Sequence, residues 1–153
     1  MFVAKKFYIG TGYGKDLFEI ASFDKALLMA GLSDYNLVRV SSIVPPKAEQ
    51  QMNFDYPKGS VLFTAYSKNT TTKEELISSA VAVGIPKSEK DVGVIMEYSC
   101  LGNKEEAVSI AKKLVSEALL RRGINDFDII ANGIDAQGKN GYYTTTFAAV
   151  ALF

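Results

Sequence analysis

The sequence of 153 residues contains no histidine and a single cysteine, Cys100. Without histidine the chain cannot use Ser-His or Cys-His catalysis, and every histidine-based metal site is excluded. One cysteine cannot form an intrachain disulfide or a Cys-x-x-Cys site, and we expect Cys100, which follows an apolar strand, to pack as a small apolar side chain. No metal site is expected. Serines and carboxylates remain as the reactive side chains.

The chain also lacks an excess of either charge and any long apolar run. Lys and Arg together number 17, as do Asp and Glu, so no net field attracts nucleic acid or a membrane surface. No apolar run of about 20 residues could span a membrane, and the first residues lack the basic-then-apolar order of a signal peptide. We therefore expect a cytoplasmic protein. Its length and its 48% hydrophobic content fit one domain, residues 1–153, with a sizeable core.

Apolar spacing predicts a mixture of strands and helices. Strands are expected at 2–9, 37–40, 60–66, 93–98, 127–131 and 142–153, and helices at 22–31, 72–84 and 104–122. Ser22 is expected to cap the first helix, and Thr72 with Glu75 forms a capping-box pattern at the second. This mixture is typical of an α+β fold or an α/β sandwich.

The glycine-rich run Gly10-Thr11-Gly12-Tyr13-Gly14 has the spacing Gly-x-Gly-x-Gly, which does not match a dinucleotide-binding fingerprint. We interpret it as a flexible turn near the active site.

Two adjacent serines, Ser41 and Ser42, lie where the expected strand 37–40 gives way to a turn. The following Pro45-Pro46 cannot donate ladder hydrogen bonds and ends the strand. In a strained backbone, the Ser42 hydroxyl can attack the Ser41 carbonyl and convert the amide into an ester. The alternative is a purely structural role, in which both serines only cap a turn.

Such an ester leads to a reactive carbonyl group. The Asn36 amide can donate to the oxyanion that forms at the Ser41 carbonyl. β-Elimination would then release Ser41 as a carboxylate and leave Ser42 as dehydroalanine, and hydrolysis with loss of ammonia would give a pyruvoyl group. This ketone can form a Schiff base with a substrate amine and withdraw electrons from it, so no external cofactor is needed.

Two stretches of the sequence resemble the pyruvoyl-dependent arginine decarboxylases: residues 34–46, with Asn-x-x-x-x-Ser-Ser-Ile-x-Pro-Pro, and residues 93–98, with Gly-x-x-x-Glu-Tyr. A Ser-Ser pair alone is a weak signal, but the two motifs together are specific, and the resemblance covers essentially the whole chain. It implies an α+β fold of the layered αββα type, with a single domain self-cleaved into residues 1–41 and 42–153. It also implies a homotrimer with each active site at a subunit boundary.

The resemblance also implies the activity, conversion of L-arginine to agmatine and CO2, and the roles of individual residues. Glu97 would donate the proton to the carbanion that remains when CO2 leaves, and a carboxyl group among the apolar side chains of Ile95, Met96 and Tyr98 suits that role because it is costly to ionise. The remaining roles are cleavage at Ser41 with support from Asn36, formation of the pyruvoyl group from Ser42, and substrate binding by Asp24, Leu27 and Ser41.

Two of these residues could also have purely structural roles. Asp24 can be a helix first-turn carboxylate instead of the partner of a guanidinium, and Glu97 can lie on the polar face of a strand.

Two other functions stay open at this point. The same self-processing could serve another amino acid, since pyruvoyl histidine decarboxylases also cut a Ser-Ser bond. The chain could also be an unprocessed, non-catalytic paralogue that acts as a binding or assembly subunit.

Overall fold

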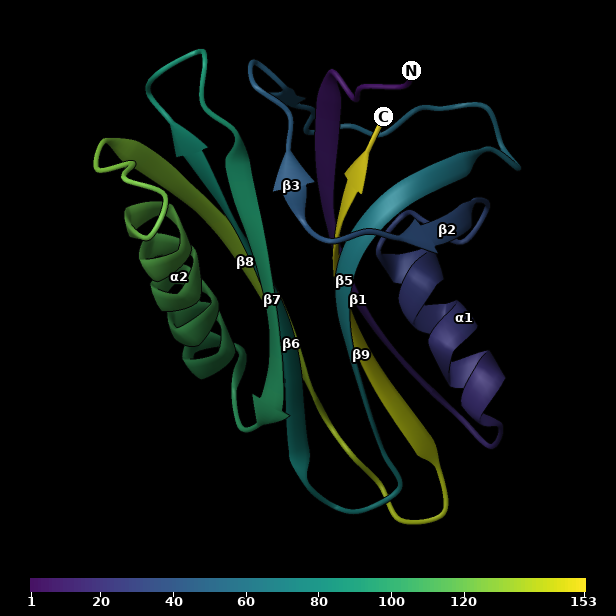
Figure 1. Cartoon of the computed structure of the whole chain (residues 1–153). Coiled ribbons are helices and arrows are strands. Elements are labelled where there is room, and N and C mark those ends of the chain that lie inside the picture. Colours follow the sequence, from purple (N-terminus) through teal and green to yellow (C-terminus); the bar gives the residue numbers. More distant parts are fainter.

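The computed structural model describes all residues, 1–153, as two sheets placed face to face with one helix on each outer side (Figure 1). The strands of the first sheet follow the order β2-β5-β9-β1-β4, and those of the second the order β3-β7-β6-β8. The elements are β1 (Lys6–Asp16), α1 (Glu19–Met29), β2 (Asn36–Arg39), β3 (Ile43–Val44), β4 (Glu49–Gln50), β5 (Val61–Thr71), β6 (Leu76–Pro86), β7 (Gly93–Leu101), α2 (Lys104–Leu120), β8 (Phe127–Gln137) and β9 (Tyr143–Leu152). The expected single α+β domain with αββα layers is confirmed.

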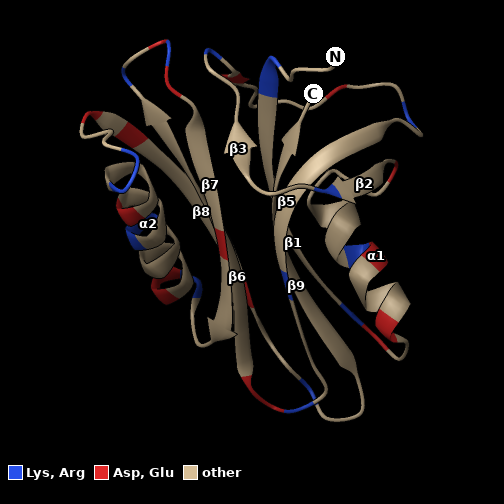
Figure 2. Cartoon of the chain, viewed as in Figure 1, with Lys and Arg blue, Asp and Glu red and all other residues tan.

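Three apolar clusters hold these layers together. The inner cluster lies between the sheets and includes Phe7, Val81 and Val150. A second cluster lies between α2 and the second sheet, and a third lies between α1 and the first sheet. Charged residues occur mainly on the helices and the connecting loops, whereas the strands carry few of them (Figure 2). Neither helix is long and apolar enough to cross a membrane.

The predicted helix over 72–84 is wrong, because this segment forms the turn after β5 and then strand β6. The side chains of β6 alternate between two apolar surroundings: Val81 and Val83 face the first sheet, and Ala80 and Ala82 face α2. With both faces covered, the strand shows no apolar-polar alternation, and its apolar positions also fit helical spacing. Glu75 accepts a hydrogen bond from the Thr71 hydroxyl across the β5–β6 turn, so the expected capping box of Thr72 with Glu75 is not formed.

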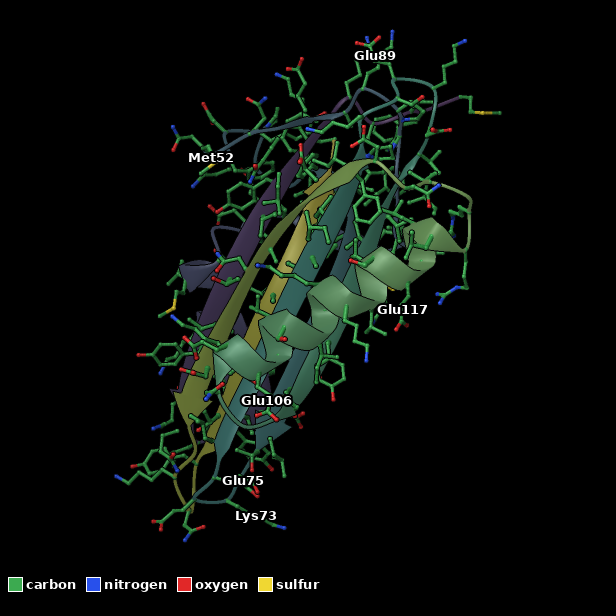
Figure 3. The ribbon with its side chains drawn as sticks, turned by 90° about the vertical axis from the view of Figure 1, so that its left-hand side faces the viewer. Met52, Lys73, Glu75, Glu89, Glu106 and Glu117 are labelled. Atoms are coloured by element: carbon green, nitrogen blue, oxygen red, sulfur yellow. The ribbon has the colours of Figure 1, made fainter.

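Figure 3 shows α2 lying along the second sheet, with Lys73 and Glu75 at the β5–β6 end of the sandwich and Met52 and Glu89 at the opposite end. α2 follows its prediction closely and begins at Lys104; the preceding Asn103 caps it, since its side chain accepts a hydrogen bond from the backbone N–H of Glu106.

The prediction of a flexible turn at the glycine run is also wrong, since these residues form the middle of β1. A Cβ atom added at Gly12 would lie 2.2 Å from the Ala26 carbonyl oxygen, and one added at Gly14 would lie 2.2 Å from the Ser22 carbonyl oxygen. The glycines therefore allow α1 to lie directly on the strand. Ser22 does not cap α1, which begins at Glu19; its hydroxyl is buried and hydrogen-bonds to Thr145.

Candidate active site

The chain crosses from one sheet to the other at the two serines. Strand β2 pairs with β5 in the first sheet, and β3 pairs with β7 in the second (Figure 1). The backbone N–H of Val40 donates to the Thr64 carbonyl at 3.3 Å, and the Ser42 carbonyl accepts from the N–H of Ile95 at 2.9 Å. The Ser41–Ser42 peptide bond therefore lies between Val40, which is hydrogen-bonded to the first sheet, and the Ser42 carbonyl, which is hydrogen-bonded to the second.

Ser42 has a positive φ of 74°, and Lys47 is the only other non-glycine residue with a positive φ. A side chain in the left-handed region clashes with its own backbone, at a cost of about 1–3 kcal/mol. The strain lies at the bond predicted to break, and the attachments of Val40 and Ser42 to opposite sheets keep it from relaxing. The sequence-based condition of a strained backbone is thus met at Ser42.

The Ser42 hydroxyl donates to the carboxylate of Glu97, with Oγ at 3.2 Å from both carboxylate oxygens. Glu97 follows Ile95 by two residues on β7, so its side chain is on the face that packs between the sheets. Only 18% of the Glu97 side chain is exposed. Two predicted residues that are 55 positions apart in the sequence are thus brought together, and the carboxylate is placed to accept the Ser42 proton.

Arg39 is a third member of this group that sequence reasoning missed. Its Nη2 atom lies 4.0 Å from Glu97 Oε1 and 2.9 Å from the Tyr66 carbonyl oxygen. The guanidinium carbon lies 4.6 Å from the centroid of the Tyr66 ring. A basic residue on a short exposed strand gives no signal in the sequence, because the contact with Glu97 depends on how the two sheets meet.

Two hollows flank the site. One, of about 380 Å³, is lined mostly by apolar side chains and includes Ser41, Ser42, Val40, Phe2 and Phe63. The rings of Phe2 and Phe63 are 5.2 Å apart, so the N-terminal segment forms part of its wall. The other hollow, of about 670 Å³, contains Arg39, Tyr66, Lys68, Glu97 and Tyr98. The first gives apolar surroundings to the serines, and the second gives Glu97 a polar approach.

The structure does not bring the other predicted residues to Ser42. Asn36 donates its side-chain amide to the Gly59 carbonyl at 2.9 Å, at the end of β2 away from the serines. Its predicted contact with the Ser41 carbonyl is therefore not formed within this chain. Asp24 is exposed on α1 without an ion pair, and Leu27 is half-buried against the first sheet. The residues expected at one site fall into two groups on different sides of the first sheet.

No metal site accompanies these groups, since the chain has no cluster of three or more Cys, Asp or Glu side chains that could hold a metal ion. At the serines, a hydroxyl on a strained residue lies beside a carboxylate. This donor set fits a group made from Ser42 itself, because nothing but the chain's own atoms is needed to form it.

Residues 6–153 match the family described as pyruvoyl-dependent arginine decarboxylase (PvlArgDC). The chain belongs to this family. The pyruvoyl-dependent arginine decarboxylase of Methanococcus aeolicus is 39% identical to it over 144 residues, which cover 94% of this chain and 86% of that protein. The proteins of the same name from Thermococcus kodakarensis and Methanopyrus kandleri are 33% and 30% identical, and both matches cover at least 95% of each chain.

Proteins of the pyruvoyl-dependent arginine decarboxylase family use a covalently bound pyruvoyl group, and Ser42 is the residue here that fits as its source. The family relationship therefore agrees with the geometry at the junction between the sheets.

Proposed function

We propose that this chain cuts itself between Ser41 and Ser42 and becomes a decarboxylase that converts L-arginine to agmatine and CO2. The observation that carries the proposal is the Ser42 hydroxyl held against Glu97 at a strained residue of the crossing between the sheets. The names of the relatives support arginine as the substrate, whereas nothing favours histidine or a non-catalytic role.

Cleavage begins with proton transfer from Ser42 Oγ to Glu97. The oxygen attacks the Ser41 carbonyl carbon, the peptide C–N bond breaks, and the proton passes to the freed amine of Ser42. The amide has then become an ester, and the positive φ of Ser42 can relax. Backbone strain and hydrogen bonding thus act at the same residue, since Glu97 raises the nucleophilicity of the Ser42 hydroxyl and the Ser42 backbone is held out of its preferred conformation.

Elimination then completes the cut. The Cα proton of Ser42 is removed and the Cβ–Oγ bond breaks, so the Ser41 side leaves as a carboxylate and residue 42 becomes dehydroalanine. Tautomerisation and addition of water release ammonia and leave a ketone at the new N-terminus. Residues 1–41 and 42–153 would form the two chains, joined by the hydrogen bonds of β2 with β5 and of β1 with β9.

Once formed from Ser42, the pyruvoyl group would supply a carbonyl able to bind the substrate amine and to withdraw electrons from the α-carbon. Glu97 gives a proton to that carbon in place of the departing CO2. Its neighbours favour this role, because the side chain is mostly enclosed and faces residue 42. The apolar lining of the hollow beside Ser41 and Ser42 would disfavour a charged carboxylate in the substrate relative to neutral CO2.

Substrate recognition requires a second copy of the chain in this proposal. Asp24 would receive the guanidinium through paired hydrogen bonds, and Leu27 would contact the aliphatic part of the substrate. Both lie on α1, so we propose a homotrimer in which α1 of one copy faces Ser42 of the next. Large apolar side chains exposed at both ends of α1 support a covering partner there: Leu17, Phe18, Ile20, Leu28 and Met29. Asn36 would act at the same boundary.

The test is the intact mass of the purified chain under denaturing conditions, followed by an assay of agmatine and CO2 release from arginine, histidine, lysine and ornithine. We expect two fragments, residues 1–41 and 42–153, with the larger one blocked to amine-reactive sequencing, and release from arginine alone. A single species of 16.7 kDa that stays whole on heating and releases no CO2 would contradict the proposal.

A further inference from the structure

Arg39 is held in place by a single neighbouring residue on β5. Its guanidinium donates to the Tyr66 carbonyl at 2.9 Å and stacks on the Tyr66 ring at 4.6 Å. A planar guanidinium that is both hydrogen-bonded and stacked has few free rotations left. The same Nη2 atom that donates to the Tyr66 carbonyl also lies 4.0 Å from Glu97 Oε1. Arg39 is thus a fixed charge beside the carboxylate that accepts the Ser42 proton.

This contact adds little to folding stability. The Arg39 side chain is 61% exposed, and ion pairs of exposed side chains contribute little because water screens them. A carboxylate that must stay aimed at one hydroxyl nevertheless benefits from a fixed positive charge at its side, since small displacements of reacting groups strongly change rates. The expected consequence of the contact is therefore kinetic.

We propose that Arg39 is a positioning residue that keeps the Glu97 carboxylate turned toward Ser42 during self-cleavage. The inference rests on the proposed function, since it concerns the rate of that cut. It adds a second consequence: Arg39 stays with residues 1–41 after the cut, whereas Glu97 belongs to residues 42–153. The contact then links the two fragments beside the new chain ends.

Lys68 provides a matched control in the same hollow. It lines that hollow together with Arg39 and Glu97, and it is also a cation placed over an aromatic ring, with Nζ at 4.5 Å from the centroid of Phe23. It forms no ion pair with Glu97. Replacing Lys68 removes the same charge from the same hollow but leaves the contact between Arg39 and Glu97 in place.

The experiment measures the rate at which freshly made full-length chain converts to fragments, for the wild type, Arg39→Gln and Lys68→Gln, together with the melting temperature of each uncut chain. We expect Arg39→Gln to cut about tenfold more slowly, with an unchanged melting temperature, and Lys68→Gln to cut at the wild-type rate. Equal rates for the two variants would overturn the proposal. A wild-type chain that does not cut contradicts the proposed function instead, so the two failures are distinguishable.

A double-mutant comparison shows whether Arg39 acts through Glu97. In a Glu97→Gln background the carboxylate is absent, so adding Arg39→Gln should not slow the cut further. A further tenfold slowing there would overturn the positioning role, because Arg39 would then act on the serines by another route.

Arg39→Lys gives a milder test that does not depend on the folding of the Gln variant. Lysine keeps the charge but cannot stack as a plane and donate in a fork, so the rate should lie between those of the wild type and Arg39→Gln. A wild-type rate would contradict the role of the fixed plane, and a rate as low as that of Arg39→Gln would contradict the role of the charge.

Discussion

The junction between the sheets and the outer face of α1 hold the two halves of the candidate site, and they differ in how complete they are. At the junction, Glu97 contacts both Ser42 and Arg39 within one chain. On α1, Asp24 is exposed without an ion pair, and Leu27 is half-buried against the first sheet. Chemistry that a chain performs on itself must be built within that chain. Recognition of arginine does not carry this constraint and can be divided between copies.

The largest expected effect is that of Ser42→Ala, which removes the attacking oxygen at the junction. The chain should stay whole and inactive, as shown by its intact mass. Ser41→Ala is the matched control, because Ser41 contributes a backbone carbonyl to the attack and its hydroxyl forms no hydrogen bond in the structure. It should still cut. A cleaved Ser42→Ala chain would refute the attack mechanism, and an uncut Ser41→Ala chain would show that the first hydroxyl also takes part.

Glu97→Gln should reduce both self-cleavage and turnover by roughly 10²- to 10⁴-fold, because the amide can neither take the Ser42 proton nor supply one to the substrate. Fragment formation is followed by mass, and turnover is measured on whatever fraction has cut. Glu89→Gln removes an exposed carboxylate that pairs with Lys47 at an end of the sandwich (Figure 3), so it should leave both rates unchanged. A Glu97→Gln chain that cuts at the wild-type rate would restrict Glu97 to the second reaction.

The junction was predictable from sequence because its chemistry is local. Ser41 and Ser42 are adjacent, and Glu97 belongs to a second recognisable motif. Arg39 was not predictable, since its contact with Glu97 depends on how edge strand β2 of the first sheet meets β7 of the second. Asn36 was expected at the Ser41 carbonyl, but β2 is extended and its amide meets the Gly59 carbonyl instead.

The two wrong secondary-structure predictions, at the glycine run and at β6, also arise from contacts between layers that the sequence does not show. Gly12 and Gly14 suggest a turn until α1 is placed on β1, after which they are the residues that permit the contact. Likewise, β6 lacks apolar-polar alternation because one of its faces packs on the first sheet and the other on α2. The sequence of residues 76–86 alone does not indicate that both faces are covered. The α2 helix was predictable because one side of it stays exposed and its amphipathic pattern survives.

Asp24→Asn should leave self-cleavage unchanged and raise the KM for arginine by roughly tenfold to a hundredfold, because one charged hydrogen-bonding partner of the guanidinium is lost. Co-expression with Ser42→Ala then tests whether the halves belong to different copies. Ser42→Ala chains cannot make the pyruvoyl group but carry an intact Asp24. Mixed oligomers should therefore regain part of the activity at low arginine concentration. Activity that never exceeds that of Asp24→Asn alone would place both halves in one chain.

The smallest effect concerns how α1 is attached to β1 near Asp24. Lys25 Nζ lies 2.7 Å from the Asp16 carboxylate, and hydrogen bonding by Lys25, with help from the Phe18 N–H, lowers the pKa of Asp16 below its usual value. A carboxyl with a lowered folded-state pKa stabilises the fold above its unfolded pKa, and this contribution is lost as the pH falls through the folded pKa.

Lys25→Gln should therefore lower the melting temperature slightly at neutral pH, and the difference from the wild type should shrink in acid as Asp16 becomes protonated. Scanning calorimetry between neutral and acidic pH measures it, with Asp16→Asn as the matched control that should show the same small decrease. The rate of self-cleavage should not change, because the pair holds α1 alone. A slower cut in Lys25→Gln would show that the position of α1 affects the junction between the sheets within one chain. The two halves of the candidate site would then not be independent.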